Sequence, residues 1–353
     1  MKIELHDRFR GCLIGGGIGD ALGYPVEFMS LSEIKAQYGS LGIRKLVLDS
    51  RSGKALISDD TQMTLFTASG LLWAQHRMKN RGIGSYTNSG IYPSYLRWLY
   101  TQDSVRRRPA FLKEQAFERA GAPRIMDVKE LYACRAPGNT CLSALESGIM
   151  GEMELPINDS KGCGGVMRIA PVGLLLHRTP LNACGTAAKA AAITHGHPSG
   201  YLSAGVLASL IAELLNGKTL IDAYTTGCEC LRLFSQHEET SAILELAVVL
   251  AHSDMDSEEA IARLGQGWVG EEALAIALYC ALKEKDPLTA LIMSVNHDGD
   301  SDSTGAICGN LLGAMHGTSA FPSDWIENLE IATFIFEMAD TLYRTTSKAE
   351  AHS

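Results

Sequence analysis

Two apolar stretches of the chain carry a glycine at every fourth position, and this spacing constrains the fold more than any other feature. One series is Gly11, Gly15, Gly19 and Gly23, and the other is Gly305, Gly309, Gly313 and Gly317. On a helix, residues four apart lie on one face, so each series predicts a flat ridge without side chains. A glycine inside a helix costs about 1 kcal/mol relative to alanine. We therefore expect the two ridges to pack together, with Gly15 and Gly19 against Gly309 and Gly313.

Glycine at this spacing also occurs where transmembrane helices pair. The uncharged run from Ser303 to Ala314 is about a dozen residues long, well short of the ~20 that cross a bilayer. The N-terminal segment has no long apolar stretch typical of a signal peptide. The nine cysteines are odd in number and scattered, which favours reduced thiols. We expect a cytoplasmic protein that does not enter a membrane.

Apolar residues recur at helical spacing through most of the chain, and no run alternates with the period of a strand. No linker rich in small or proline residues divides the sequence. We therefore expect an all-α protein in which residues 1–353 form a single domain. The net charge of −9 argues against a general nucleic-acid-binding protein, which normally carries a basic face.

Oxygen-bearing side chains crowd into two short segments about 240 positions apart. Asp300, Asp302 and Ser303 stand directly before the second glycine series, and Ser58, Asp59 and Asp60 open an amphipathic stretch. Capping of a helix needs only one such residue, so two adjacent acids favour a metal site. Four carboxylates and two hydroxyls match two divalent cations, and ligands that are all oxygen favour Mg²⁺ or Mn²⁺ over zinc. If the segments share one site, the predicted fold carries a dinuclear metal centre.

Two further segments suggest contacts with a substrate. Residues 160–176 combine a loop of small residues with an apolar run, a form suited to presenting backbone N–H groups to phosphate. Two helices are expected to break at His195-Gly196-His197-Pro198. The interpretations of His195 as a substrate contact and as a structural residue both stay open, and the lack of a nearby third soft ligand disfavours zinc.

Residues 77–113 carry eight Lys or Arg against one acid, with tyrosines and a tryptophan between them. A basic and aromatic segment can bind RNA. A contact for phosphates, a contact for an acidic partner protein, and a solvated helix face are the alternatives. We expect this segment to be a specificity insertion.

Five motifs in order resemble the ADP-ribosylglycohydrolase family over nearly the whole chain. They are Gly19-Asp20-Ala21-Leu22-Gly23 with Glu27, Ser58-Asp59-Asp60-Thr61, Gly165-Val166-Met167-Arg168-Ile169-Ala170-Pro171, Thr194-His195-Gly196 and Gly299-Asp300-Ser301-Asp302-Ser303-Thr304-Gly305. The resemblance implies an orthogonal helical bundle with a dinuclear Mg²⁺ or Mn²⁺ centre. It further implies hydrolysis of the N-glycosidic bond between ADP-ribose and a protein side chain. The Gly-Asp-Ser-Asp-Ser-Thr-Gly form resembles the arginine-specific branch.

Roles for individual residues follow from the same resemblance. It implies that Ser58, Asp59, Asp60, Asp300, Asp302 and Ser303 hold the metals, and that Glu27, Asp60 and Asp302 act in catalysis. It implies that Gly162, Cys163, Gly164, Gly165 and Met167 line the diphosphate region and that His195 contacts the ribose or the phosphates. Asp20 is expected to be buried and structural. The expected partners are ADP-ribose and an ADP-ribosylated protein. The alternative is an immunity protein that neutralises an ADP-ribosyltransferase toxin by binding it.

Overall fold

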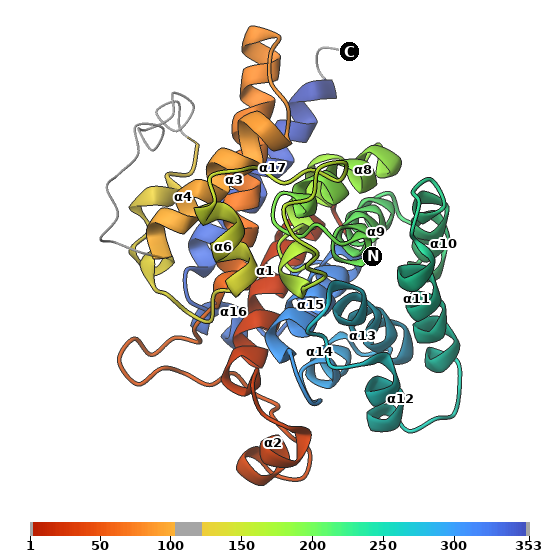
Figure 1. Cartoon of the computed structure of the whole chain (residues 1–353). Helices are drawn as coiled ribbons and strands as arrows, with labels where there is room; N and C mark the ends of the chain where they lie inside the picture. Colours follow the sequence, from red (N-terminus) through yellow and green to blue (C-terminus); the bar gives the residue numbers. More distant parts are fainter. Residues whose placement is uncertain (1–2, 103–121, 351–353) are drawn as a thin grey trace.

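The protein is built from α-helices (Figure 1). The structure is a computed structural model, and it describes residues 3–102 and 122–350. Within these ranges only isolated β-bridges occur, such as the antiparallel bridge between Leu48 and Ala55. The expected all-α fold is confirmed.

The helices follow one another along the chain, and longer connections lie at residues 39–58 and 147–162. The N-terminal part contains α1 (Leu5–Gly23), η1 (Tyr24–Val26), α2 (Leu31–Tyr38), α3 (Asp59–Arg81), η2 (Thr87–Ile91), α4 (Tyr92–Gln102), η4 (Ile125–Asp127), η5 (Lys129–Tyr132) and α6 (Asn139–Glu146). The middle contains η6 (Cys163–Gly165), α7 (Ala170–Leu175), α8 (Pro180–Ala192), α9 (Pro198–Leu215), α10 (Leu220–Leu231) and α11 (Glu238–Ala251). The C-terminal part contains α12 (Ser257–Leu264), α13 (Gly270–Lys283), α14 (Pro287–Ser294), α15 (Ser301–His316), η7 (Thr318–Ala320), α16 (Ser323–Asn328) and α17 (Ala332–Glu350).

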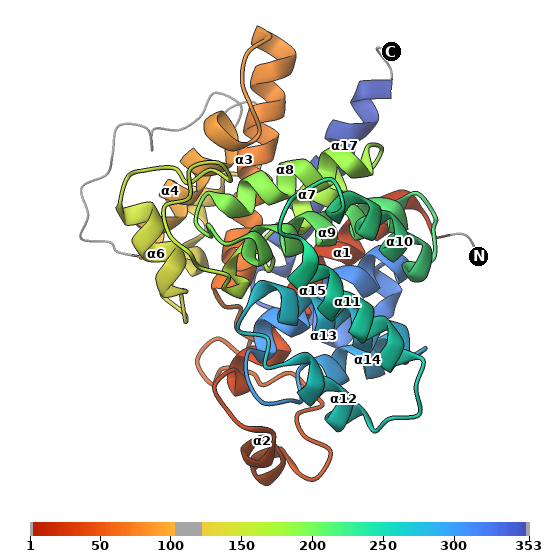
Figure 2. The ribbon, with the colours of Figure 1, turned by 45° about the vertical axis from the view of Figure 1, so that its right-hand side comes forward.

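Helices α1 and α15, from opposite ends of the chain, lie side by side at the centre of the molecule (Figures 1 and 2). Their glycine ridges face each other in antiparallel register. A β-carbon built on Gly15 would overlap the carbonyl oxygen of Gly309, and one on Gly19 would overlap that of Gly305. The expected packing of the ridges is therefore observed. The expected register needs one correction, because Gly313 lies opposite Gly11 rather than Gly15 or Gly19.

Helix α9 is apolar around nearly its whole circumference. It is the one helix among residues 3–102 and 122–350 that is long and apolar enough to cross a membrane, and 94% of that segment is buried inside the protein. Helices α7, α8, α10, α13 and α15 pack around it. A helix that is hydrophobic on all sides and covered in this way is typical of a protein core.

Both α8 and α10 contact α9, which brings Cys184 and Cys230 together although they are 46 positions apart. A disulfide joins them. The expectation that Cys184 is a reduced thiol is therefore wrong, because sequence spacing does not reveal which helices share a neighbour. The other seven cysteines are free.

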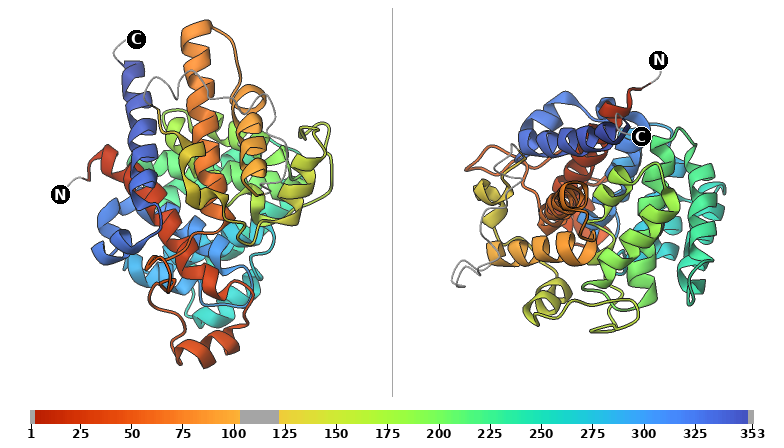
Figure 3. Two further views of the ribbon diagram at one scale, coloured as in Figure 1. Left: turned by 90° about the vertical axis from the view of Figure 1, so that its left-hand side faces the viewer. Right: turned by 90° about the horizontal axis from the view of Figure 1, so that it is seen from above.

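The segment expected to be a specificity insertion is only partly described. Its first part forms the end of α3, the π-helical turn η2 and α4, and Figure 3 shows α3 end-on from above beside α4. Tyr95 and Trp98 are completely buried, so these two aromatic side chains belong to the core and offer no surface for bases. The expected basic residues Arg106, Arg107 and Arg108 lie outside the described residues.

Candidate functional site

A cavity of about 330 Å³ opens where the N-termini of α3 and α15 meet the turn after η1. Five carboxyl groups line it, from Glu27, Asp59, Asp60, Asp300 and Asp302. The other lining residues are Phe28, Ala136, Pro137, Gly138, Asn139, Thr140, Cys141, Gly162, Cys163, Gly164, Met167, His195, Trp268 and Ser303. The volume is in the range of small-molecule sites. The fold thus brings together the two acidic segments that the sequence separates.

The packing of the glycine ridges creates this meeting point. Because α1 and α15 are antiparallel, the end of α1 at Gly23 lies against the start of α15 at Ser301. Asp300 caps α15 by accepting a hydrogen bond from the backbone N–H of Ser303 at 3.2 Å. Gly299 has a φ of 120°, and a β-carbon there would overlap the carbonyl oxygen of Gln266. Only glycine allows the turn that carries Asp298, Asp300 and Asp302, called the acidic turn below, to approach the loop at Gln266 so closely.

Asp20 connects α1 to the start of α3. Its side chain is completely buried and accepts hydrogen bonds from the backbone N–H groups of Ser58, at 3.0 Å, and of Thr61, at 3.1 Å. The hydroxyl of Thr61 also donates to it. Burial raises the pKa of Asp20 to about 6, although these hydrogen bonds lower it. Asp20 is therefore structural, as expected, and it holds the segment that carries Asp59 and Asp60.

The carboxyl groups of the cavity are crowded and poorly neutralised. Oxygens of Glu27, Asp300 and Asp302 lie within 4.8 Å of one another. Glu27 Oε2 and Asp60 Oδ2 are buried and have no hydrogen-bond partner in the part of the chain that the structure describes. The pKa of Glu27 is raised to about 9, first by burial and then by the nearby Asp300 and Asp59.

The pKa values of Asp59, Asp60 and Asp302 are also raised well above the ordinary value, first by burial. The next cause is a like charge: Asp59 acts on Asp60, and Asp60 acts on Asp302. Buried oxygen donors without a protein counter-charge fit divalent cations, which neutralise such a cluster. An oxygen donor set suits Mg²⁺ or Mn²⁺. The residues present therefore fit the metals that the sequence analysis expected.

Two predicted metal ligands differ in their placement. Ser303 lines the cavity, and its hydroxyl lies beside Asp60. Ser58 does not line the cavity; its hydroxyl caps α3 by accepting a hydrogen bond from the N–H of Asp60 at 3.2 Å. The resemblance implied a catalytic role for Glu27 and did not include it among the metal ligands, yet Glu27, Asp300 and Asp302 together form a cluster that could hold a metal ion.

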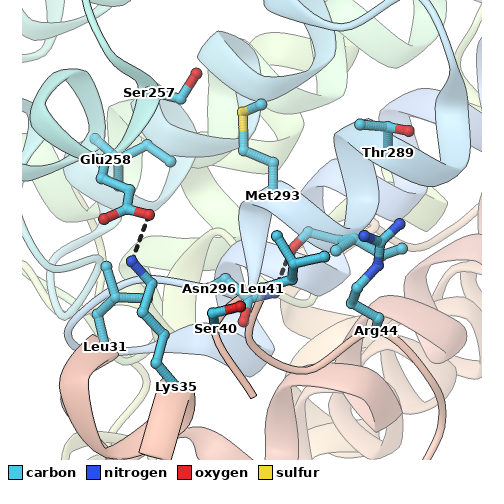
Figure 4. Close-up of a pocket in the computed structure, with 12 residues that line it drawn as sticks. Leu31, Lys35, Ser40, Leu41, Arg44, Ser257, Glu258, Thr289, Met293 and Asn296 are labelled. Atoms are coloured by element: carbon cyan, nitrogen blue, oxygen red, sulfur yellow. Dashed lines mark hydrogen bonds and ion pairs between the residues drawn. The ribbon is translucent and has the colours of Figure 1, made fainter. Parts of the chain in front are cut away.

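The segment after Glu27 is anchored to the acidic turn. The backbone N–H of Leu31, the first residue of α2, donates to Asp298 Oδ1 at 2.5 Å. Further along α2, Lys35 forms an ion pair with Glu258 of α12 at 2.6 Å, across a second cavity of about 230 Å³ (Figure 4). These contacts restrain the position of Glu27 relative to Asp300.

The loop of small residues forms the opposite wall. Gly162, Cys163, Gly164 and Met167 line the cavity. The thiol of Cys163 donates to Asp300 Oδ2 at 2.8 Å. Gly165 does not line the cavity: it is buried behind the loop, where a β-carbon would lie 2.9 Å from the carbonyl oxygen of Gly200.

Two aromatic residues at the cavity were not predicted. Phe28 and Trp268 stack with their ring centroids 5.6 Å apart and an angle of 19° between the rings. Both are accessible, with 73% of Phe28 and 38% of Trp268 exposed. The position of Phe28 directly after Glu27 was the available signal, whereas no motif marked Trp268.

Comparisons with known proteins show which family the chain belongs to. Residues 1–352 match the family model described as ADP-ribosylglycohydrolase. The chain is 26% identical to the ADP-ribosyl-[dinitrogen reductase] glycohydrolase of Rhodospirillum rubrum, with 93% of this chain and 92% of that protein covered. It is 20% identical to the ADP-ribosylarginine hydrolase Tri1 of Pseudomonas putida, with 96% and 78% covered.

A solved structure described as an ADP-ribosylglycohydrolase-related protein complex has the same fold. It matches with a TM-score of 0.61 and 23% identity, and the match covers 97% of this chain and 99% of that chain. The resemblance stated from the motifs is thus confirmed. The chain belongs to the ADP-ribosylglycohydrolase family and is a hydrolase enzyme.

Proposed function

We propose that the protein hydrolyses the N-glycosidic bond between ADP-ribose and a protein side chain, with arginine as the modified residue. The observation that carries this proposal is the cavity in which five buried carboxyl groups face a glycine loop and His195. The Gly-Asp-Ser-Asp-Ser-Thr-Gly motif and the similarity to an ADP-ribosylarginine hydrolase support arginine.

We assign two Mg²⁺ ions, with Mn²⁺ as the alternative, to Asp59, Asp60, Asp300, Asp302 and the hydroxyl of Ser303. The Ser58 hydroxyl accepts one hydrogen bond as the cap of α3 and keeps a second lone pair, so it stays the sixth proposed ligand. When bound, the ions supply electrophilic stabilisation and a template for the ribose hydroxyls. The protein itself restrains these carboxylates through Asp20, through the cap at Asp300 and through the thiol of Cys163. This rigid arrangement supports catalysis by positioning.

We assign proton transfer to Glu27. Departure of the side-chain nitrogen from ribose requires a proton, and a carboxyl group that faces the cavity can deliver one. Glu27 Oε2 has no hydrogen-bond partner among the described residues, and the residue lines the cavity. We also assign Asp60 and Asp302 to catalysis, because they would hold the cations.

The proposal is tested by measuring release of ADP-ribose from arginine-, serine- and cysteine-linked substrates, each with Mg²⁺ and with a chelator. Release from the arginine-linked substrate alone, and only with the metal, is the expected result. Release from another linkage would overturn the arginine assignment, and release in the chelator would overturn the metal assignment. Nothing in the fold, the site or the comparisons favours the alternative of a protein that neutralises a toxin by binding it.

A further inference from the structure

A completely buried guanidinium lies behind the cavity. Arg168 is 0% exposed, and it forms no ion pair with a carboxylate in the described part of the chain. Its Nη2 donates to Thr194 Oγ1 at 2.6 Å, and its Nη1 lies 3.4 Å from Cys141 Sγ. The guanidinium carbon lies 4.2 Å from the centroid of the Tyr95 ring. Among these contacts the shortest is to the Thr194 hydroxyl, and Thr194 is itself completely buried.

The hydroxyl of Thr194 connects Arg168 to His195. Its oxygen lies 2.6 Å from Arg168 Nη2 and 2.8 Å from His195 Nδ1. Arginine can only donate hydrogen bonds, so the Thr194 oxygen accepts from it and its own hydrogen needs another acceptor. The neighbours that could accept are His195 Nδ1 and the sulfur of Cys141, and sulfur is a weak acceptor. Donation to His195 Nδ1 is therefore the stronger of the two hydrogen bonds open to the Thr194 hydroxyl.

The other ring nitrogen faces the cavity. A β-carbon built on Gly162 would lie 3.4 Å from His195 Nε2, and one on Gly164 would lie 3.3 Å from it. His195 lines the cavity, and Nε2 has no hydrogen-bond partner among residues 3–102 and 122–350. Glycines at these two positions leave Nε2 open to a ligand.

We propose that Arg168 and Thr194 are positioning residues that hold His195 as the neutral tautomer with its proton on Nε2. Burial, followed by the charge of Arg168, lowers the pKa of His195 to about 3, so the ring is neutral at physiological pH. His195 thus offers one N–H donor to the cavity. The opposite tautomer would present a lone pair there and would repel an oxygen anion.

The expected ligand of this N–H is an oxygen acceptor of ADP-ribose, either on phosphate or on ribose. This assignment rests on the proposed function, whereas the tautomer does not. A single oriented donor fits an acceptor-only oxygen. It also avoids adding a second positive charge beside the buried Arg168.

The tautomer is tested directly by ¹⁵N NMR of the ¹⁵N-histidine-labelled full chain without ligand, because protonated and unprotonated ring nitrogens resonate far apart. The signals are assigned by their loss in His195→Gln. The expected spectrum shows unprotonated Nδ1 and protonated Nε2, unchanged from pH 8 to pH 6. A protonated Nδ1, or a ring that becomes charged in this range, would overturn the proposal without any variant at Thr194.

The role of Thr194 is tested with a matched pair of variants. Thr194→Val keeps the size but removes the hydroxyl, so we expect mixed tautomers and roughly 3- to 10-fold weaker binding of ADP-ribose by calorimetry. Thr194→Ser keeps the hydroxyl and is expected to restore both the single tautomer and the wild-type affinity for ADP-ribose. A Thr194→Val protein that retains the wild-type ¹⁵N spectrum would show that Thr194 does not determine the tautomer of His195.

The direction of the N–H is tested with two amides. Glutamine places its NH₂ near Nε2 and asparagine places its NH₂ near Nδ1, so His195→Gln should bind ADP-ribose more tightly than His195→Asn. The reverse order would overturn the assigned orientation. If the wild type shows the expected tautomer but does not bind ADP-ribose, the proposed function fails, whereas the assigned tautomer of His195 stands.

Discussion

The carbonyl oxygen of Gly15 faces the α-carbon of Gly309 so closely that a β-carbon on Gly309 would overlap it. The same contact repeats along the interface of α1 and α15, and it ends at the acidic turn that carries Asp300 and Asp302. The ridge therefore determines both the central packing and the position of half of the candidate metal ligands.

Replacing Gly309 by alanine should push the two helices apart. We expect a loss of roughly 1–3 kcal/mol in the free energy of unfolding, because a methyl group has no space there. The control is Gly185→Ala in α8, where no atom lies within 4 Å of the added carbon; it should stabilise the protein by up to about 1 kcal/mol. Denaturant unfolding measures both, and equal effects of the two changes would contradict the account.

Removing one carboxylate of the cluster should abolish turnover and leave the helical fold intact. In Asp302→Ala or Asp60→Ala, one ligand for the cations is missing and the remaining charges repel less. We expect no release of ADP-ribose, an unchanged far-UV circular dichroism spectrum, and loss of the rise in Tm that Mg²⁺ causes in the wild type. Asp254→Asn, at an exposed position, is the control and should behave as wild type. Turnover near the wild-type rate in either alanine variant would contradict the metal assignment.

The metal-free protein should become less stable as pH rises from about 5 to about 9. Burial, followed by Asp300, raises the pKa of Glu27 to about 9 in the folded protein, whereas an unfolded glutamate titrates at about 4.3. Between these values the native state binds more protons than the unfolded state, so its stability falls with rising pH. Tm measured in a chelator tests this expectation, and a flat or rising profile would contradict it.

Glu27→Gln separates the two roles considered for this residue. The neutral amide cannot titrate, so the slope of Tm against pH in the chelator should decrease. If Glu27 handles the proton, the variant should lose turnover and keep the rise in Tm with Mg²⁺; loss of that rise would make Glu27 a metal ligand instead. Glu327→Gln, at an exposed position, is the control and should change neither.

Reversing the charges of Arg106, Arg107 and Arg108 tests the basic segment, whose residues 103–113 lie outside the described ranges. If the segment attracts acidic protein substrates, the triple change to Glu should lower kcat/KM for a modified protein and reduce its dependence on salt. Hydrolysis of free ADP-ribosylarginine should stay nearly constant, and it serves as the internal control. Equal losses on both substrates would place these arginines at the phosphates of ADP-ribose.

Local patterns in the sequence were sufficient for the fold class and for much of the composition of the site. Helical spacing of apolar residues predicts an all-α chain because periodicity is a local property. The glycine series predict that α1 and α15 pack together, since nothing else offsets the seven of these glycines that lie inside helices. The density of acids at Asp59 and Asp60, and at Asp300 and Asp302, predicts a shared cation site because such charges need neutralisation.

Only the tertiary structure decided which of these residues meet. Gly165 lies behind the loop, and Glu27 joins Asp300 and Asp302, because the cavity is formed by helix ends whose register depends on the whole α1–α15 contact. The pairing of Cys184 with Cys230 requires two helices to share α9. The environment of His195 likewise depends on a buried guanidinium 27 positions earlier in the chain. Contacts between distant segments follow from packing geometry, which no local spacing encodes.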